Sequence, residues 1–221
     1  RAMSDKVFFI QSGFSKCATS AFAKLFQGSG YKALHSGGRI WRLQGHPAIT
    51  EIAPQRRIAQ NIDAGRPPLA GLEEFDAFFD MIAFTDANAT PREHHKRFDL
   101  FAEAYPNAKF LLNTRDEDDW LRSRLRHDDG QFAKNLMAAA GIDQDGLIRT
   151  WRQEFRDHHA RVRAYFADRP GRCLEFDTGH DDVARLIDFA RPDFTLNPKR
   201  WRRVRVTDEV ARRKGWRGPG D

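Results

Sequence analysis

Cysteine is nearly absent from this sequence of 221 residues. Cys17 and Cys173 are too few for a disulfide framework, so we expect the chain to work in a reducing compartment. No apolar run approaches the roughly 20 residues that a membrane-spanning helix needs. The N-terminus lacks the apolar core of a signal peptide, and we expect Arg1 and Ala2, which precede Met3, to be a cloning remnant. These absences predict a cytoplasmic protein without a membrane span.

Phenylalanine and charge, in contrast, are abundant. The sequence is 40% hydrophobic and contains 18 Phe residues, which is enough to fill a core and excludes intrinsic disorder of the whole chain. It carries 37 Lys and Arg against 31 Asp and Glu, and the net charge of +6 suits an anionic ligand, nucleic acid or an acidic surface. The length favours one domain over residues 1–221, and residues 199–221 form its basic C-terminal segment.

Short apolar runs alternate along the chain with longer amphipathic segments. Strands are expected near residues 6–12, 31–34, 75–82, 108–114 and 172–176. Helices are expected over residues 18–26, 49–62, 91–105, 117–127, 145–168 and 181–190, with Pro91 at a first helical position. Buried apolar strands that alternate with helices predict an α/β fold, with a parallel five-stranded sheet covered on both faces.

A loop with the chemistry of an anion site follows the first expected strand. It reads Gly13-Phe14-Ser15-Lys16-Cys17-Ala18-Thr19-Ser20 and leads directly into a helix. Backbone N–H groups and the positive end of the helix dipole can bind phosphate there, and Lys16 adds a full charge. The nucleotide-triphosphatase pattern GxxxxGK[ST] is absent, because Gly13 lies three residues before Lys16 and no Gly directly precedes it. The alternative is an ordinary turn with a solvated lysine and a capping hydroxyl.

A second motif follows the fourth expected strand. Asn113-Thr114-Arg115-Asp116 leads into a helix that carries Trp120 and Ser123. A guanidinium can bind phosphate with two parallel hydrogen bonds, and Ser123 can face the same side of the helix. The alternative for Arg115 is an ion pair with one of the nearby aspartates at positions 116, 118 and 119.

These two motifs resemble those of sulfotransferases that use 3′-phosphoadenosine 5′-phosphosulfate (PAPS). That family writes its 5′-phosphosulfate loop as PKSGTT or GFGRTGTTSL, which Lys16, Thr19 and the hydroxyl of Ser20 match. The sequence departs from the family at Cys17 and at Ala18, where Gly is usual and Ala adopts a positive φ only at a cost. The second motif is similar to the family's LxxRDPxxWxxS segment, and residues 104–109 to its AYPxAK approach.

The resemblance implies a P-loop fold, PAPS as co-substrate, and transfer of a sulfuryl group to a hydroxyl or amine. It implies that Arg115 and Ser123 hold the 3′-phosphate and that Lys16 acts on the leaving group. Arg212-Arg213-Lys214-Gly215 is similar to a loop that closes over the 3′-phosphate, although a solvated charge run is an equal alternative. The residues expected to bind the nucleotide are Gly13, Ser15, Lys16, Cys17, Ala18, Thr19, Ser20, Arg115, Ser123, Arg213, Lys214 and Gly215.

Sulfuryl transfer to a hydroxyl needs a general base, for which the sequence offers two candidates. Asp80 ends the third expected strand, where the resemblance implies an acidic residue, and it is preferred. His35 follows the second expected strand and has an ordinary pKa suited to a base. The structural alternatives are a cap or ion pair for Asp80 and a surface loop position for His35.

No metal site is expected. Adjacent histidines on a helix diverge by about 100° and do not chelate one ion together, so His94-His95 and His158-His159 are interpreted as solvated pairs.

Two other functions stay open, a P-loop kinase for a small molecule and a non-catalytic nucleic-acid-binding protein that uses the basic end with Trp201 and Trp216. The acceptor, a small molecule, sugar or lipid, is expected to contact residues between His35 and Pro91, while the oligomeric state is open.

Overall fold

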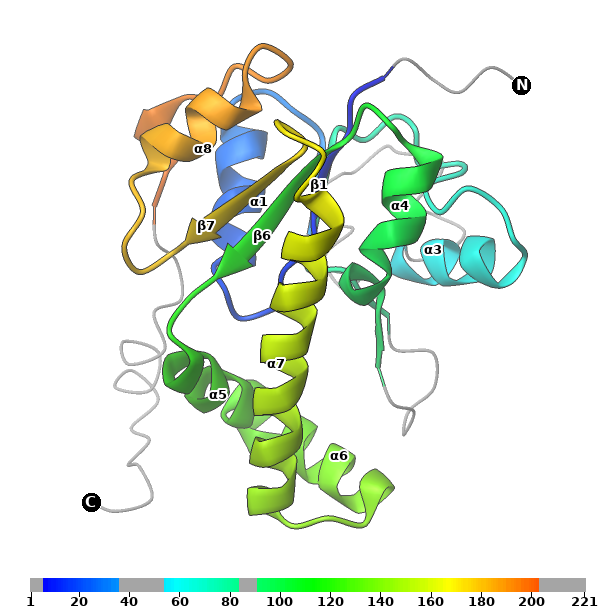
Figure 1. Cartoon of the computed structure of the whole chain (residues 1–221), viewed down its shortest axis with the longest axis vertical. Helices are drawn as coiled ribbons and strands as arrows, with labels where there is room; N and C mark the ends of the chain where they lie inside the picture. The colour runs from blue at the N-terminus through cyan, green and yellow to red at the C-terminus, as the bar shows by residue number, and fades with distance from the viewer. Residues whose placement is uncertain (1–5, 36–53, 84–90, 203–221) are drawn as a thin grey trace.

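A five-stranded parallel sheet forms the centre of the molecule. The structure is a computed structural model that describes residues 6–35, 54–83 and 91–202 (Figure 1). The strands lie in the order β2 (Ala33–His35), β3 (Ala77–Phe79), β1 (Phe9–Gln11), β6 (Lys109–Thr114) and β7 (Cys173–Asp177). Every neighbouring pair is parallel, which confirms the predicted α/β fold. The carboxyl ends of all five strands therefore meet at one edge of the sheet, with β1 in the middle.

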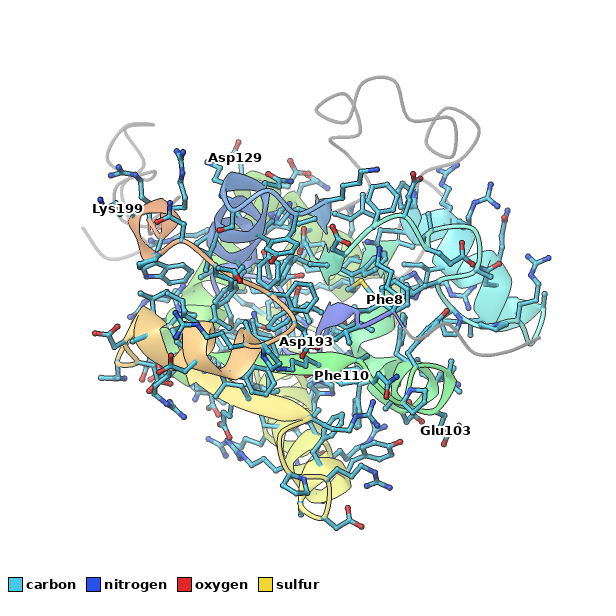
Figure 2. All side chains as sticks on the ribbon, turned by 90° about the horizontal axis from the view of Figure 1, so that it is seen from above. Phe8, Glu103, Phe110, Asp129, Asp193 and Lys199 are labelled. Carbon is cyan, nitrogen blue, oxygen red and sulfur yellow. The ribbon has the colours of Figure 1, made fainter. Side chains whose placement is uncertain are left out.

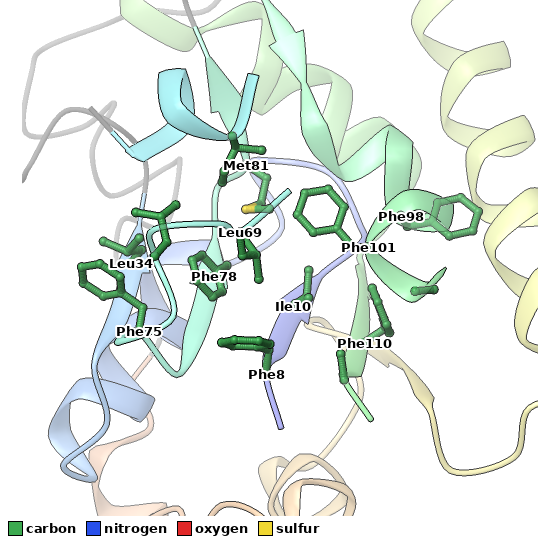
Figure 3. Packing of buried hydrophobic residues seen from close by; sticks show 14 of the residues in the cluster. Phe8, Ile10, Leu34, Leu69, Phe75, Phe78, Met81, Phe98, Phe101 and Phe110 are labelled. Atoms are coloured by element: carbon green, nitrogen blue, oxygen red, sulfur yellow. The ribbon is translucent and has the colours of Figure 1, made fainter. Parts of the chain in front are cut away.

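The central strands β1 and β6 bury both of their faces, as side chains that alternate along a covered strand must. In β1, Ile10 packs in the cluster on one face and Phe9 in the cluster on the other. Phe110 and Leu111 alternate in the same way along β6. Phe8, which precedes β1, lies beside Ile10, Phe78 and Phe110 on the first face (Figure 3).

Helices supply the other half of each core cluster. The first face is covered by α3 (Pro54–Asp63), α4 (Phe98–Ala104) and the C-terminal part of α7 (Gln144–Phe166). The second face is covered by α1 (Thr19–Gly28) and α8 (Val183–Ala190). Seen from above, Phe8 and Phe110 lie between the helix that carries Glu103 on one side and the segment of Asp193 and Lys199 on the other (Figure 2).

A third cluster lies beyond the carboxyl edge of the sheet. It joins α5 (Glu117–Leu125), α6 (Gln131–Ala140) and the first half of α7, below the end of β6 in Figure 1. Phe14 and Cys17 of the loop after β1 pack into this cluster together with Trp120 and Trp151. The loop is therefore held between the sheet and a separate group of helices. Helix α6 was not among the predicted elements.

The helix predicted to begin at Pro91 is wrong in its first half. The chain instead forms β5 (Arg92–Glu93), which pairs antiparallel with β4 (Ile82–Ala83), and then the short 3-10 helix η2 (His94–Arg97). Only α4 is helical as predicted. The backbone N–H of His94 donates to Met81 O, a contact between distant segments that a helical pattern does not reveal. Another helix was predicted over residues 49–62. Residues 54–62 belong to α3, and residues 49–53 lie outside the described residues.

The interpretation of both histidine pairs as solvated is also wrong. His94, His95, His158 and His159 are each at most 3% exposed. His158 donates from Nε2 to Ser12 O at 2.5 Å, and His94 donates from Nε2 to Gln55 O at 2.9 Å. Burial lowers the pKa of all four imidazoles, and that of His158 falls to about 4. His95, His158 and His159 pack on Phe14, with ring centroids 4.9, 5.0 and 6.0 Å away.

Among the described helices none is long and apolar enough to cross a membrane. The basic C-terminal segment begins with η4 (Pro198–Arg200), and Trp201 packs against Phe22 of α1 with ring centroids 5.2 Å apart. The Trp201 ring is thus partly buried against the core cluster on the second face of the sheet.

Candidate functional site

The predicted site residues of the described chain gather at the carboxyl edge of the sheet. The loop of residues 13–18 joins β1 to α1, and His35 is the last residue of β2. Asp80 follows β3 directly, and Arg115 follows β6. In open parallel sheets, ligands bind in the crevice outside this edge, next to the point where the strand order reverses. Here that point is β1, the strand from which the loop begins.

The backbone of this edge is strained at three residues that are not glycine. Lys16, Ala18 and Asp80 have φ angles of 71°, 59° and 55°. The left-handed conformation costs about 1–2 kcal/mol at each such residue. The sequence analysis noted that Gly is usual at position 18 and that Ala adopts a positive φ only at a cost. Ala18 nevertheless adopts a positive φ here. Strain of this kind persists where surrounding contacts enforce it, and it is concentrated at functional sites.

Side chains from β6 and α5 enforce the loop conformation. The amide of Asn113, which is fully buried, donates to Phe14 O at 3.0 Å and to Cys17 O at 2.8 Å. The indole of Trp120 donates to Ser15 O at 3.0 Å. These bonds satisfy three loop carbonyls from inside the protein and hold the loop against β6 and α5.

Two residues of β1 and its turn bring the loop close to its neighbours. Gly13 lies so near Asn113 that an added Cβ would overlap the Asn113 backbone, so only Gly fits. Gln11 is fully buried, and its amide donates to Gly13 O at 2.8 Å while its Oε1 accepts from the backbone N–H of Asp80. Gln11 therefore ties the loop to the end of β3.

Cys17 faces the protein core. Burial raises the pKa of its thiol to about 12, although the positive charges of Arg115 and Arg124 oppose that rise. A thiol of this kind stays protonated and is a poor nucleophile. Of Cys17, only the backbone is suitably placed to meet a ligand.

Asp80 contacts the loop through its carboxylate. Ser15 Oγ donates to Asp80 Oδ1 at 2.6 Å, and Ser15 is 7% exposed. The carboxylate is thereby held over the loop, at the edge where a substrate would meet it. This is the position predicted for Asp80, and its role as a base stays a prediction.

His35 contacts the loop at the other end. Its Nε2 lies 3.1 Å from Thr19 Oγ1 and 3.0 Å from Ser20 Oγ. Both hydroxyls belong to the first turn of α1, where Ala18 offers no side-chain cap. His35 is therefore a neighbour of the predicted phosphate ligands, and it is half-buried.

Lys16 extends from the strained loop toward the helix cluster. Its Nζ lies 2.7 Å from Nδ1 of His127, in the 3-10 helix η3 (His127–Gly130) that follows α5. Burial and the charge of Lys16 lower the pKa of His127. Because an ammonium can only donate, Nδ1 of His127 is the acceptor of this hydrogen bond.

Arg115 joins the two predicted phosphate motifs. Its guanidinium donates from Nη1 to Lys16 O at 3.2 Å, and Nη2 forms a longer ion pair with Asp119 at 3.5 Å. The ion pair considered as the alternative for Arg115 is therefore present, with Asp119 as its partner, and the phosphate role of Arg115 stays a prediction. Asp116 caps α5 by accepting from the N–H of Asp119, and Ser123 is half-buried farther along that helix.

Sequence reasoning missed four residues of this site, Gln11, Asn113, Trp120 and His127, as supports of the loop. Gln11 and Asn113 are polar residues at the ends of apolar strands, which is a signal that could have identified them. The predicted closing stretch Arg213-Lys214-Gly215 lies outside the described residues, as do residues 36–53 and 84–90 of the predicted acceptor region.

Comparison with known protein families gives a match for this chain. The search of curated proteins found no match for the chain. The family model described as the sulfotransferase domain matches residues 8–136, more than half of the chain. This range contains β1, the strained loop, Asp80, Arg115 and α5. The chain belongs to the sulfotransferase domain family.

Proposed function

We propose that this protein transfers a sulfuryl group from PAPS to a hydroxyl or amine of a small molecule, sugar or lipid. The observation that carries the proposal is the strained loop between β1 and α1, with Lys16, Arg115 and Asp80 gathered around it. Sulfuryl transfer needs a site for a nucleotide with two anionic groups, positive charge at its leaving oxygen and a base near the acceptor. The following paragraphs assign these tasks.

The loop from Ser15 to Ser20 suits the 5′-phosphosulfate. Asn113 and Trp120 bind carbonyls of this loop from inside and hold its backbone in place, and an anion would bind to the loop N–H groups. The first N–H groups of α1 and its dipole favour negative charge at the same point. The hydroxyls of Thr19 and Ser20 add donors in the first turn. The donor set fits a phosphate or sulfate group.

Arg115 and Ser123 suit the 3′-phosphate. Arg115 lies against the loop at Lys16 O, so an anion bound to its guanidinium is close to one bound by the loop. Its ion pair with Asp119, at 3.5 Å and with the Asp119 side chain 42% exposed, is weak enough to exchange for a phosphate. A site built around a 3′-phosphate leaves its donors unpaired with a nucleotide that lacks it.

Lys16 and Asp80 suit the two ends of the transfer itself. The Lys16 ammonium stabilises the charge that develops on the leaving phosphate oxygen. The Asp80 carboxylate, held by Ser15, accepts the proton of the acceptor hydroxyl or amine. We assign His35 to the phosphate side instead, because its Nε2 is engaged by Thr19 and Ser20. Cys17 and Cys173 are both free thiols, which suits the cytoplasmic location that we propose.

The test is a thermal-shift series with adenosine 3′,5′-bisphosphate, ADP, and ATP with Mg²⁺. At a concentration of 100 times its Kd, a ligand stabilises the folded state by about 2.7 kcal/mol, which raises Tm by roughly 5–10 °C in a chain of this size. We expect that rise with the bisphosphate and a clearly smaller one with the other two. A rise with ATP and Mg²⁺ alone would instead support a P-loop kinase, and no rise with the bisphosphate would contradict the proposal.

A further inference from the structure

The contact between Lys16 and His127 joins two segments that are 111 residues apart. At 2.7 Å between Nζ and Nδ1 it is as short as a charge-assisted hydrogen bond. The His127 ring also packs edge-on against Phe132 of α6, with centroids 5.4 Å apart. Asp128 and Asp129, the next two residues, have φ angles of 53° and 50°. The histidine thus stands beside a left-handed turn and against a helix, while lysine has a long side chain with several rotatable bonds.

The charges around His127 keep its ring a hydrogen-bond acceptor. Lys16 approaches it from the loop and Arg124 from α5, and both disfavour a second positive charge. Asp80 from the end of β3 and Asp128 from its own turn act in the opposite direction, but burial and Lys16 outweigh them. Because Nδ1 accepts the bond from Lys16, the neutral ring carries its proton on Nε2.

An ammonium has three donors, so a bond to His127 leaves its ability to contact an anion intact. A lysine that is free to rotate loses about 0.5–1.5 kcal/mol of rotamer freedom when a ligand immobilises it. A lysine that is already held by the protein avoids that loss. Its ammonium then also stays at one place relative to the strained loop.

We propose that His127 is a positioning residue, which holds the Lys16 ammonium at the phosphate loop so that it is ordered before the nucleotide arrives. This inference rests on the proposed function, because Lys16 is assigned there to the leaving group. It adds a residue that lies outside both phosphate motifs. His127 acts only through Lys16 and touches neither the nucleotide nor the acceptor.

The first arm of the test measures the pair without any nucleotide. Nitrogen-15 NMR follows the titration of the His127 ring in wild type, in Lys16→Met and in the control Lys134→Met, which changes an exposed lysine on α6. The pKa of His127 should rise in Lys16→Met, since a neighbouring positive charge is removed, and stay unchanged in Lys134→Met. An identical titration in Lys16→Met and wild type would overturn the inference.

The second arm measures the Kd of adenosine 3′,5′-bisphosphate by calorimetry. His127→Ala should bind it roughly three- to tenfold more weakly, the cost of ordering one lysine on binding. His127→Asn, whose side-chain oxygen lies where Nδ1 lies, should recover most of that loss, which a purely structural role would not explain. If wild type binds the bisphosphate and His127→Ala binds it with the same Kd, only this inference is overturned. Absence of binding to wild type overturns the proposed function and the inference with it.

Discussion

Acidification should weaken the fold through His158, which supports the residue just before the phosphate loop. His158 lies on α7, and its Nε2 donates to Ser12 O at 2.5 Å. The ring is 3% exposed and packs on Phe14, with centroids 5.0 Å apart. Burial, opposed only in part by the bond to Ser12, lowers its pKa from 6.5 to about 4. Protonation would place an imidazolium in the core under the loop.

The sign and size of the effect follow from these two pKa values. The pKa of His158 in the folded state lies below its unfolded value, so the folded state binds fewer protons. The contribution of His158 to the free energy of unfolding is therefore fully present above pH 6.5. That stability is lost as the pH falls from 6.5 toward 4. Between pH 7 and pH 5 the linkage relation gives a loss of about 2 kcal/mol from His158 alone.

The assay is urea unfolding of wild type and His158→Gln at both pH values. Gln keeps an N–H donor near the Nε2 position and does not titrate, so its stability should fall by about 2 kcal/mol less than that of wild type. His180→Gln is the control, because the His180 side chain is 82% exposed, and its pH dependence should match that of wild type. Equal losses in wild type and His158→Gln would refute the reasoning.

Three further predictions concern the proposed transfer. Lys16→Ala should lower turnover by about 10²–10³-fold with little change in Tm, because it removes positive charge at the leaving oxygen and no core packing. Near wild-type turnover would contradict the role of Lys16 at the leaving group. Arg115→Ala should lose most of the preference for adenosine 3′,5′-bisphosphate over AMP, so that the ratio of their Kd values, measured by calorimetry, falls by about 10- to 100-fold. A variant that keeps the preference would contradict the assignment of Arg115 to the 3′-phosphate. Asp80→Asn should lose about 10²–10⁴-fold in turnover but still bind the bisphosphate, whereas His35→Asn should lose less turnover. If His35→Asn loses more turnover than Asp80→Asn, His35 is the base.

Much of the fold could be predicted because its signals are local. Apolar runs such as the one around β6, followed by amphipathic helices, predict a covered parallel sheet without knowledge of long-range contacts. The strand before Asp80 could be predicted in the same way, although it was expected over residues 75–82 and β3 ends at Phe79. The loop was recognised from its Lys and hydroxyl pattern in front of α1.

The errors concern residues whose surroundings come from distant segments. His158 and His159 occupy the buried stripe of α7 between Phe155 and Val162, so the spacing did contain a signal that their polarity concealed. The segment at Pro91 pairs with β4 instead of forming a helix, and only the tertiary contacts decide this. His127 reaches Lys16 through a turn of left-handed aspartates, for which the sequence pattern has no marker.

The most direct test of the central claim is a crystal structure of the protein with adenosine 3′,5′-bisphosphate. The account predicts the 5′-phosphate within about 3 Å of the Lys16 ammonium and of loop N–H groups between Ser15 and Ser20. It also predicts the 3′-phosphate on the Arg115 guanidinium. A bisphosphate bound away from this loop, or one whose 3′-phosphate points away from Arg115, would contradict it.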